Sequence, residues 1–318
     1  MKVKYFILGA GALFATIGYM GYRKKEVNTE PEIAATEIVQ EIDIAPKPQP
    51  APTPILETTS VPAVTAEIDR IPQLFTLDSS KLPIVETISY TSRVPWLKGR
   101  PAWISDYASH YETSRHFIAR SLNKKADYFT QKVGPGDKFN IFKKDAKIQF
   151  HLLIDLAKAK MRFYYIDLAT NERTLLKTYK VGLGRADTMK KSGYLTPIGK
   201  YELGNRIAIY KPGTMGFFQD KKTEMIRIFG TRWIPFEKEI DGCSEPAKGL
   251  GLHGTPWIQD LSGTLIEDRA KIGKYDSDGC VRLAQEDMEE LFSIIITKPT
   301  TVELVRSFED AKLPGVEK

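Results

Sequence analysis

Two cysteines and four histidines are the side chains of this 318-residue sequence best suited to nucleophilic chemistry. Cys280 lies in the run Ser-Asp-Gly-Cys-Val-Arg, with a glycine directly before the thiol and an arginine two residues after it. A thiol nucleophile needs a base that takes its proton, donors for an oxyanion and an open backbone around the sulfur. His253 ends an apolar segment and precedes a glycine, in Gly-Leu-His-Gly-Thr. We therefore predict a thiol–imidazole pair of Cys280 and His253.

The residues around this pair have the apolar pattern of a β-rich domain. Ile148, Phe150, Leu152 and Ile154 alternate with other residues and would point to one face of a strand. Further strands are expected at 161–165, 175–181, 200–210, 225–229, 249–253 and 302–305. One helix is expected at 284–296, after the cysteine motif, because apolar residues recur there at helical spacing.

Three motifs in a fixed order resemble a known catalytic domain. His253-Gly254-Thr255 is followed by Ser-x-Gly-Cys-Val-Arg and a helix, and it is preceded by Thr-Pro-Ile-Gly-Lys-Tyr at 196–201. Over residues 146–306 this order resembles the catalytic domain of bacterial L,D-transpeptidases of the YkuD type. The resemblance implies a mainly β, β-sandwich-like domain with a short helix after the catalytic cysteine.

Two features depart from the pattern of that family. Asp278 stands before Gly279, where many members carry histidine, so no role is assigned to this side chain. His253 lies 27 residues before Cys280, which is a longer interval than in compact members. We expect an inserted loop at about residues 258–275 that could shape a substrate groove.

The resemblance implies a role for each residue of the motifs. Cys280 would be the nucleophile, and His253 would take its proton and later protonate the leaving amine. The carbonyl of Gly254 would orient the imidazole. The backbone N–H groups of Gly279 and Cys280 would face the oxyanion.

Four neighbouring residues are candidates for substrate binding. They are Arg282, Ser277, Thr255 and Tyr194. Each also has a simpler interpretation, which is a structural ion pair for Arg282, a turn hydroxyl for Ser277, and ordinary packing for Thr255 and Tyr194.

The reaction that the resemblance implies is acyl transfer on peptidoglycan stem peptides. Cys280 would form a thioester with release of D-alanine, and a side-chain amine of another stem would resolve it to a 3→3 cross-link. Carbapenems would acylate the same thiol. Two alternatives stay open, an L,D-carboxypeptidase that uses water at the same site and a non-catalytic peptidoglycan-binding protein.

The second cysteine, Cys243, tests this interpretation, because paired cysteines in an exported protein could form a disulfide. Such a bond to Cys280 would contribute about 3 to 4 kcal/mol through loop closure. It would also remove the nucleophile, so we predict that Cys243 is free. A metal site of both cysteines and His253 lacks an evident fourth ligand. We therefore expect no metal. The sequence also lacks a glycine-rich pattern that would bind a nucleotide, so no cofactor is expected.

Residues 86–145 form a small α+β segment with the predicted order strand, helix, helix, strand. Ser114 is the expected N-cap of the second helix, and Gly-Pro-Gly-Asp at 134–137 turns the chain into the last strand. The segment resembles the latter half of a LysM carbohydrate-binding module, which implies binding of glycan strands. A plain packing subdomain is the alternative.

The two ends of the chain differ in composition from its middle. Residues 6–22 carry no charge and would span about 26 Å as a helix, so residues 1–25 are expected to be a membrane anchor or signal segment. Residues 26–85 are rich in proline and glutamate, which favours a flexible linker. Residues 307–318 are expected to be a tail.

Charge is unevenly distributed along the chain. The net charge is +6 overall, −8 over residues 26–69 and +9 over residues 70–318. A basic domain favours a phospholipid surface or an anionic polymer such as a cell wall. Nucleic acid is not expected, because each lysine pair lies beside or next but one to an aspartate. We predict a cell-envelope protein, anchored in the inner membrane, whose catalytic domain faces the periplasm or cell wall.

Overall fold

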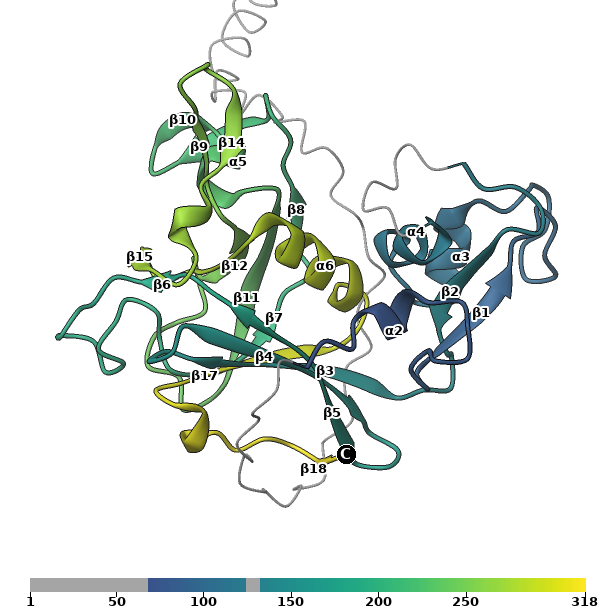
Figure 1. Ribbon diagram of the computed structural model, residues 1–318, viewed down its shortest axis with the longest axis horizontal. Helices are drawn as coiled ribbons and strands as arrows, with labels where there is room; N and C mark the ends of the chain where they lie inside the picture. The colour runs from purple at the N-terminus through teal and green to yellow at the C-terminus, as the bar shows by residue number, and fades with distance from the viewer. Residues whose placement is uncertain (1–67, 124–131) are drawn as a thin grey trace, which may run out of the picture. The chain divides into compact units, whose positions relative to one another are not determined.

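The computed structural model in Figure 1 describes residues 68–123 and 132–318. All of these residues belong to one compact unit. The predicted anchor, residues 1–25, and residues 26–67 of the predicted linker lie outside the described residues. Among the helices that are described, none is both long and apolar enough to cross a membrane.

A ten-stranded mixed sheet forms the centre of the domain that begins near residue 147. Its path runs through β16 (Val281–Leu283), β12 (Gly251–Gly254), β11 (Arg232–Asp241), β7 (Gly199–Leu203), β17 (Thr300–Val305), β3 (Ile148–Asp155), β4 (Lys160–Asp167), β5 (Glu172–Lys180) and β18 (Val316–Glu317), with β8 (Ala208–Ile209) beside β11. The predicted mainly β fold is confirmed.

Short two-stranded sheets surround the central one. They pair β9 (Met215–Phe218) with β10 (Lys221–Glu224), β13 (Trp257–Gln259) with β14 (Leu265–Glu267), and β6 (Leu183–Gly184) with β15 (Tyr275–Ser277). A 3-10 turn, η1 (Arg269–Lys271), follows the second of these hairpins.

Helix α6 (Gln285–Ile295) covers one face of the sheet, as Figure 1 shows. Its residues Met288, Leu291 and Phe292 are buried in the same core as the alternating apolar residues of β3 and β17. The predicted helix 284–296 is confirmed to within one residue at each end, because its apolar stripe is long enough to distinguish helical spacing from alternation.

The strand predicted at 225–229 is wrong. Ile226–Phe229 form the short helix α5, and the N–H of Gly230 closes its last turn on the carbonyl of Ile226 at 3.0 Å. Gly230 then reverses the chain with φ of +62°. Five apolar-rich residues fit either period, so the pattern alone could not decide between helix and strand.

The small α+β segment has the predicted order of elements. They are β1 (Val85–Ser89), α3 (Ile104–His110), α4 (Arg115–Asn123) and β2 (Lys138–Phe142), and the two strands pair antiparallel. Ser114 is confirmed as the N-cap of α4, because its hydroxyl accepts hydrogen bonds from the N–H groups of His116 at 3.1 Å and Phe117 at 3.3 Å. The resemblance to LysM stays a prediction.

The predicted linker boundary at residue 85 is wrong. Helix α2 (Pro72–Phe75) lies within the folded unit, and Ile71, Leu74 and Leu82 are buried in the core of the sheet domain. The backbone N–H of Arg70 donates to Leu176 of β5 at 2.7 Å. These apolar residues offset the entropy of ordering the chain, although the neighbouring prolines resemble those of a linker.

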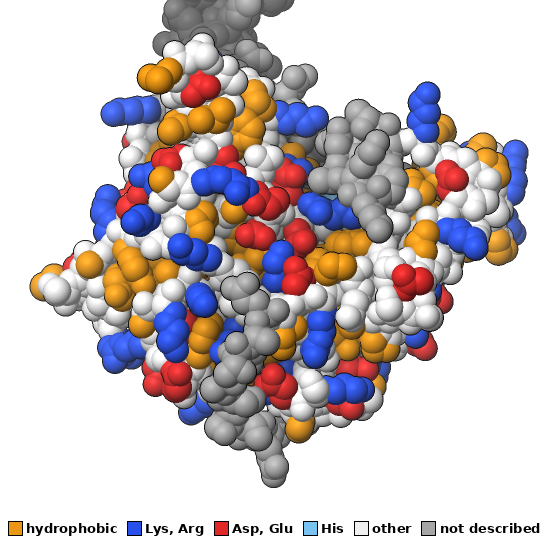
Figure 2. All heavy atoms as spheres, in the orientation of Figure 1, with side chains coloured by type: hydrophobic (Ala, Val, Ile, Leu, Met, Phe, Trp, Pro, Cys, Tyr) orange, Lys and Arg blue, Asp and Glu red, His pale blue; other side chains and the backbone are white. Residues whose placement is uncertain are grey.

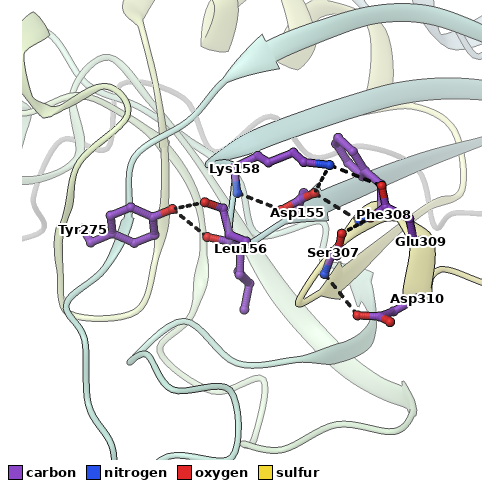
Figure 3. A network of polar contacts seen from close by, with 9 residues as sticks. Asp155, Leu156, Lys158, Tyr275, Ser307, Phe308, Glu309 and Asp310 are labelled. Atoms are coloured by element: carbon purple, nitrogen blue, oxygen red, sulfur yellow. Dashed lines mark hydrogen bonds and ion pairs between the residues drawn. The ribbon is translucent and has the colours of Figure 1, made fainter. Parts of the chain in front are cut away.

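The predicted tail, residues 307–318, is also folded. Figure 3 shows η2 (Phe308–Asp310) beside the buried carboxylate of Asp155, which accepts a hydrogen bond from the N–H of Phe308 at 3.0 Å. Arg173 is fully buried and donates to the carbonyls of Pro314 at 2.9 Å and Gly315 at 2.8 Å. The last strand then lies along the edge of β5.

Candidate active site

Strand pairing brings the two predicted catalytic residues onto one face of the sheet. β12 and β16 are parallel, with His253 opposite Arg282 and Leu252 opposite Val281. Cys280 directly precedes β16, so it lies opposite Gly251. Because side chains alternate along a strand, Cys280 and His253 share a face as diagonal neighbours on adjacent strands.

The imidazole of His253 is held in one orientation. Its Nδ1 lies 2.7 Å from the carbonyl oxygen of Gly254, which can only accept a hydrogen bond. Nδ1 therefore carries the proton, and Nε2 keeps the lone pair that a base needs. The ring is buried and packs against Phe229, with ring centroids 5.4 Å apart, and against Trp233 at 5.9 Å.

Burial keeps both members of the pair neutral. It lowers the pKa of His253 to about 3, although hydrogen bonds to the backbone of Gly254 and Phe229 oppose the shift. Burial also raises the pKa of the Cys280 thiol to about 11, against a hydrogen bond from the Gly251 backbone and the charge of Arg282. At neutral pH the resting state is a thiol beside a neutral imidazole.

The thiol does not bond to the imidazole in this resting state. Its Sγ lies 3.6 Å from the carbonyl oxygen of Gly249, and the backbone of Gly251 also bonds to it. Such loose contacts are common in enzymes without bound substrate.

Hydrogen bonds fix the loop that carries the cysteine. The hydroxyl of Ser277 donates to the Cys280 carbonyl at 2.7 Å and accepts from the N–H of Gly279 at 3.2 Å. The carbonyl of Gly279 accepts from the Thr196 hydroxyl at 3.0 Å. Gly279 has φ of +120°, and a Cβ there would lie 2.9 Å from the carbonyl oxygen of Leu195. Only glycine fits this position.

Residues 149–304 match the YkuD family, described as an L,D-transpeptidase catalytic domain. The chain contains an L,D-transpeptidase catalytic domain. The match begins in β3 and ends in β17, so it includes the strands that hold His253 and Cys280.

Several solved structures are similar to this chain, and two of them come from different bacteria. The helical cell shape determining protein Pgp2 from Campylobacter jejuni is 18% identical with a TM-score of 0.34, and the match covers 54% of this chain and 51% of that chain. Bd1075 from Bdellovibrio bacteriovorus is 14% identical with a TM-score of 0.33, over 50% of this chain and 48% of that chain. Each match spans about half the length of the solved protein. No curated protein matches the chain.

One of the two predicted oxyanion donors of the L,D-transpeptidase domain is already engaged. The N–H of Gly279 donates to Ser277, so the prediction that it faces the oxyanion is wrong. Within the described part of the chain, the N–H of Cys280 has no hydrogen-bond partner, and it stays the candidate donor. The Gly279 N–H is engaged because the Ser277 hydroxyl points toward it. No sequence pattern predicts the orientation of that hydroxyl.

Three of the predicted substrate-binding residues bond to the protein itself. Ser277 is buried in its own turn, and Thr255 is buried and donates to the carboxylate of Glu267. Arg282 donates through Nη1 to Asp276 at 2.6 Å, so its contacts support the structural ion pair. The substrate-binding predictions for Ser277 and Thr255 are corrected accordingly.

Tyr194 lies half-buried at the edge of the domain. Its ring stacks on Tyr275, with centroids 5.0 Å apart. The hydroxyl of Tyr275 donates to the Leu156 carbonyl at 2.7 Å, which fixes the pair to the turn after β3 (Figure 3). A groove-lining role for Tyr194 stays a prediction.

The interval between His253 and Cys280 begins with a hairpin and continues through η1 and β15. β13 and β14 occupy most of its first half, and the Asp260 side chain closes the turn by accepting from the N–H groups of Ser262 and Thr264 at 2.9 Å. Figure 2 shows apolar side chains gathered over this hairpin and β9–β10. The exposed apolar residues there are Met215, Phe217, Ile258, Leu261 and Ile266.

Sequence reasoning missed the aromatic surroundings of His253 and one ion pair beside Cys280. Phe229 and Trp233 come from α5 and β11, and no spacing relates them to the histidine motif. Arg185 pairs with Asp278 at 2.7 Å, and both side chains are 59% exposed. The aspartate was visible as a departure from the family pattern, but its partner lies 93 positions earlier in the sequence.

Both cysteines are free thiols in the structure. Cys243 packs beside Gly199 of β7, and its thiol donates to the Lys200 carbonyl at 3.0 Å. Among the described residues, no group of three or more histidine, cysteine or acidic side chains is placed to hold a metal ion.

Proposed function

We propose that this protein is a peptidoglycan L,D-transpeptidase that forms 3→3 cross-links through a thioester on Cys280. The observation that carries the proposal is the fixed imidazole of His253. Its Nδ1 is bound to the Gly254 carbonyl, which fixes the ring, and strand pairing places His253 next to the segment that carries Cys280. The L,D-transpeptidase domain supplies the substrate class.

Acylation begins with the thiol in its neutral form. The proton passes from sulfur to Nε2 of His253 as the sulfur attacks the carbonyl carbon between the third residue and the terminal D-alanine. The N–H of Cys280 donates to the oxyanion that forms. The C–N bond then breaks, the imidazolium protonates the departing amine, and D-alanine leaves.

Deacylation reverses these proton movements. A neutral side-chain amine of a second stem attacks the thioester carbon, gives its proton to His253, and expels the sulfur, which recovers that proton as a thiol. One amide bond replaces another, so no nucleotide or other energy source is consumed. With water in place of the amine, the product is a shortened stem, as an L,D-carboxypeptidase would make.

The proposal is tested by incubating the full chain with soluble muropeptides that carry tetrapeptide stems. Mass spectrometry should find D-alanine and a dimer lighter than two monomers by one D-alanine. The variant Cys280→Ala should lose at least roughly a thousandfold in turnover, because it lacks the nucleophile. The matched variant Cys243→Ala should keep activity.

The other outcomes separate the alternatives. Shortened monomers without dimers would identify a carboxypeptidase. No turnover by the unmodified chain, together with binding to insoluble peptidoglycan, would identify a non-catalytic wall-binding protein. Equal turnover by Cys280→Ala would overturn the mechanism.

We also propose that the small α+β segment binds the glycan strands. Trp103 is 64% exposed at the start of α3, and Trp96 stacks on His110 with centroids 4.2 Å apart and an interplanar angle of 7°. The flat apolar faces of aromatic rings suit the apolar faces of sugar rings. Burial of an exposed tryptophan against a polysaccharide would favour binding by the hydrophobic effect.

The same substrate suggests where the protein acts. We propose that residues 1–25 anchor it in the inner membrane and that the catalytic domain faces the periplasm or cell wall, because peptidoglycan lies there. The net charge of +9 over residues 70–318 would attract an anionic wall.

A further inference from the structure

An exposed ion pair lies beside the nucleophile. Nη2 of Arg185 and Oδ1 of Asp278 are 2.7 Å apart, and Asp278 is two residues before Cys280. Two residues of chain span about 7 Å at most, so the carboxylate lies close to the sulfur. Its charge contributes to the raised pKa of the thiol, which agrees with this proximity.

The pair lies across β16 from the imidazole. On one side β16 pairs with β12, which carries His253, and on the other side Arg282 exchanges two 2.8 Å backbone hydrogen bonds with Gly182. Arg185 lies three residues after Gly182, so it is on the side of β16 away from β12. Its N–H donates to the Ser277 carbonyl at 3.0 Å. Cys280 therefore has the base on one side and the ion pair on the other.

The proposed reaction determines which part of the substrate lies on the His253 side of Cys280 and which part lies on the side of the ion pair. The leaving amine takes a proton from His253, and the attacking amine gives one to it, so both amines must lie on the side of β12. The ion pair therefore faces the acyl part of the donor. The nearest variable group there is the side chain of the third residue, whose carbonyl is attacked.

We propose that Arg185 and Asp278 bind the end of this side chain when it carries both a carboxylate and an ammonium group, as in a diaminopimelate-type residue. Arg185 takes the carboxylate and Asp278 takes the ammonium. This inference rests on the proposed function and names the donor class of the same site. The pair selects diaminopimelate-type stems over lysine-type stems, which lack the second carboxylate.

The chemistry of the pair suits such an exchange. Its two side chains are half-exposed and joined by a single ion pair, so little stability is lost when the ligand opens it. A zwitterionic ligand then replaces one ion pair with two, and a guanidinium can hold a carboxylate through two parallel hydrogen bonds. The loop that carries Asp278 is already fixed by Ser277 and Thr196.

The test compares two soluble tetrapeptide donors that differ only in this carboxylate, with diaminopimelate or lysine at position three. D-alanine release by the full chain should give a higher kcat/KM with the diaminopimelate donor. In Arg185→Gln the preference between the two donors should fall by roughly tenfold, mainly through KM. Arg185→Lys should restore part of it, and Asp278→Asn should raise KM for both donors, because both carry the ammonium.

Arg100→Gln is the matched control, because Arg100 forms a similar exposed pair with Asp106 at 2.6 Å in the small segment. Its donor preference should equal that of the unmodified chain. An unmodified chain that releases D-alanine from both donors equally, or an unchanged preference in Arg185→Gln, would overturn the inference and leave the proposed function intact. If Arg185→Gln changed only the choice between amine and water acceptors, the ion pair would face the acceptor and not the donor. That result would also overturn the inference. Failure of the unmodified chain to release D-alanine from either donor would count against the proposed function itself.

Discussion

The reactivity of Cys280 depends on a pair of residues that are both neutral at rest. A histidine motif alone suggests a group that titrates near neutrality, but complete burial among Phe229 and Trp233 lowers the pKa of His253 to about 3. The half-buried Cys280 thiol has its pKa raised to about 11, mainly by loss of solvation. Proton transfer must therefore accompany attack on the substrate, since a preformed thiolate–imidazolium pair would be unstable in this environment.

This neutral state predicts the pH dependence of alkylation. In a Cys243→Ala background, the rate with iodoacetamide should be slow at pH 7, where roughly one thiol in ten thousand is ionised. The rate should rise about tenfold for each pH unit up to about pH 10, because the ionised fraction does so below the pKa. His253→Ala should change this slope little.

The measurement is the second-order rate constant between pH 6 and 10, with thermal unfolding to check that the protein stays folded. A rate that reaches its plateau below pH 8 would reveal a thiolate stabilised by imidazolium and contradict the neutral pair.

At the residue level, the sequence predicts which residues carry the chemistry better than it predicts their hydrogen-bond partners. Cys280, His253 and Gly254 carry their chemistry in the motif, and their placement follows from one pair of parallel strands. The partners of Ser277 and Thr255 could not be predicted in the same way. A hydroxyl can bond to substrate or to its own loop, and the choice depends on a rotamer set by distant residues such as Glu267.

Among the elements, the loop before β16 controls the position of the nucleophile. Gly279→Ala should lower kcat/KM by at least roughly tenfold, because the new methyl group would meet the Leu195 carbonyl and shift Cys280. The positive φ adds a destabilisation of about 1 to 3 kcal/mol. Denaturant unfolding and D-alanine release would measure the two effects.

Gly263→Ala is the control for backbone strain alone. Gly263 has φ of +82°, but nothing lies within 4 Å of its Cβ position. It should lose stability and keep turnover. Equal turnover in both variants would show that the loop does not position the thiol.

The longer elements could be predicted because their apolar patterns repeat over several turns or residues. The alternation of β3 and the stripe of α6 show this clearly, and both bury one face in the same core. Ile226–Phe229 were too short for any period to emerge. Residues 307–318 contain isolated apolar residues such as Phe308 and Leu313, whose burial depends on a sheet face formed by other parts of the chain.

At the scale of the whole molecule, the small segment and the catalytic domain share a core. Phe117 of α4 contacts Phe142 of β2 with ring centroids 4.5 Å apart, and Phe142 contacts Phe150 of β3 at 5.9 Å. Loss of one such buried aromatic side chain costs about 3 to 5 kcal/mol. Deletion of residues 86–145 would therefore destabilise the enzyme as well as remove any glycan site.

A point variant tests glycan binding without this damage. Trp103→Ala should weaken binding of the full chain to insoluble peptidoglycan by roughly fivefold or more, because it removes an exposed aromatic ring. Turnover of a soluble stem peptide should stay unchanged. Leu168→Ala, which removes another exposed apolar side chain, should alter neither. Equal sedimentation of the two variants with peptidoglycan would favour a plain packing subdomain.

The central claim is that Cys280 is the residue that becomes acylated. A carbapenem has a strained ring that a thiol can open, so incubation with the full chain should add one drug mass per chain. Peptide mapping by mass spectrometry should place this adduct on the peptide that contains Cys280, with Cys243 still open to alkylation. An adduct on Cys243, or none while muropeptides are still turned over, would contradict the assignment.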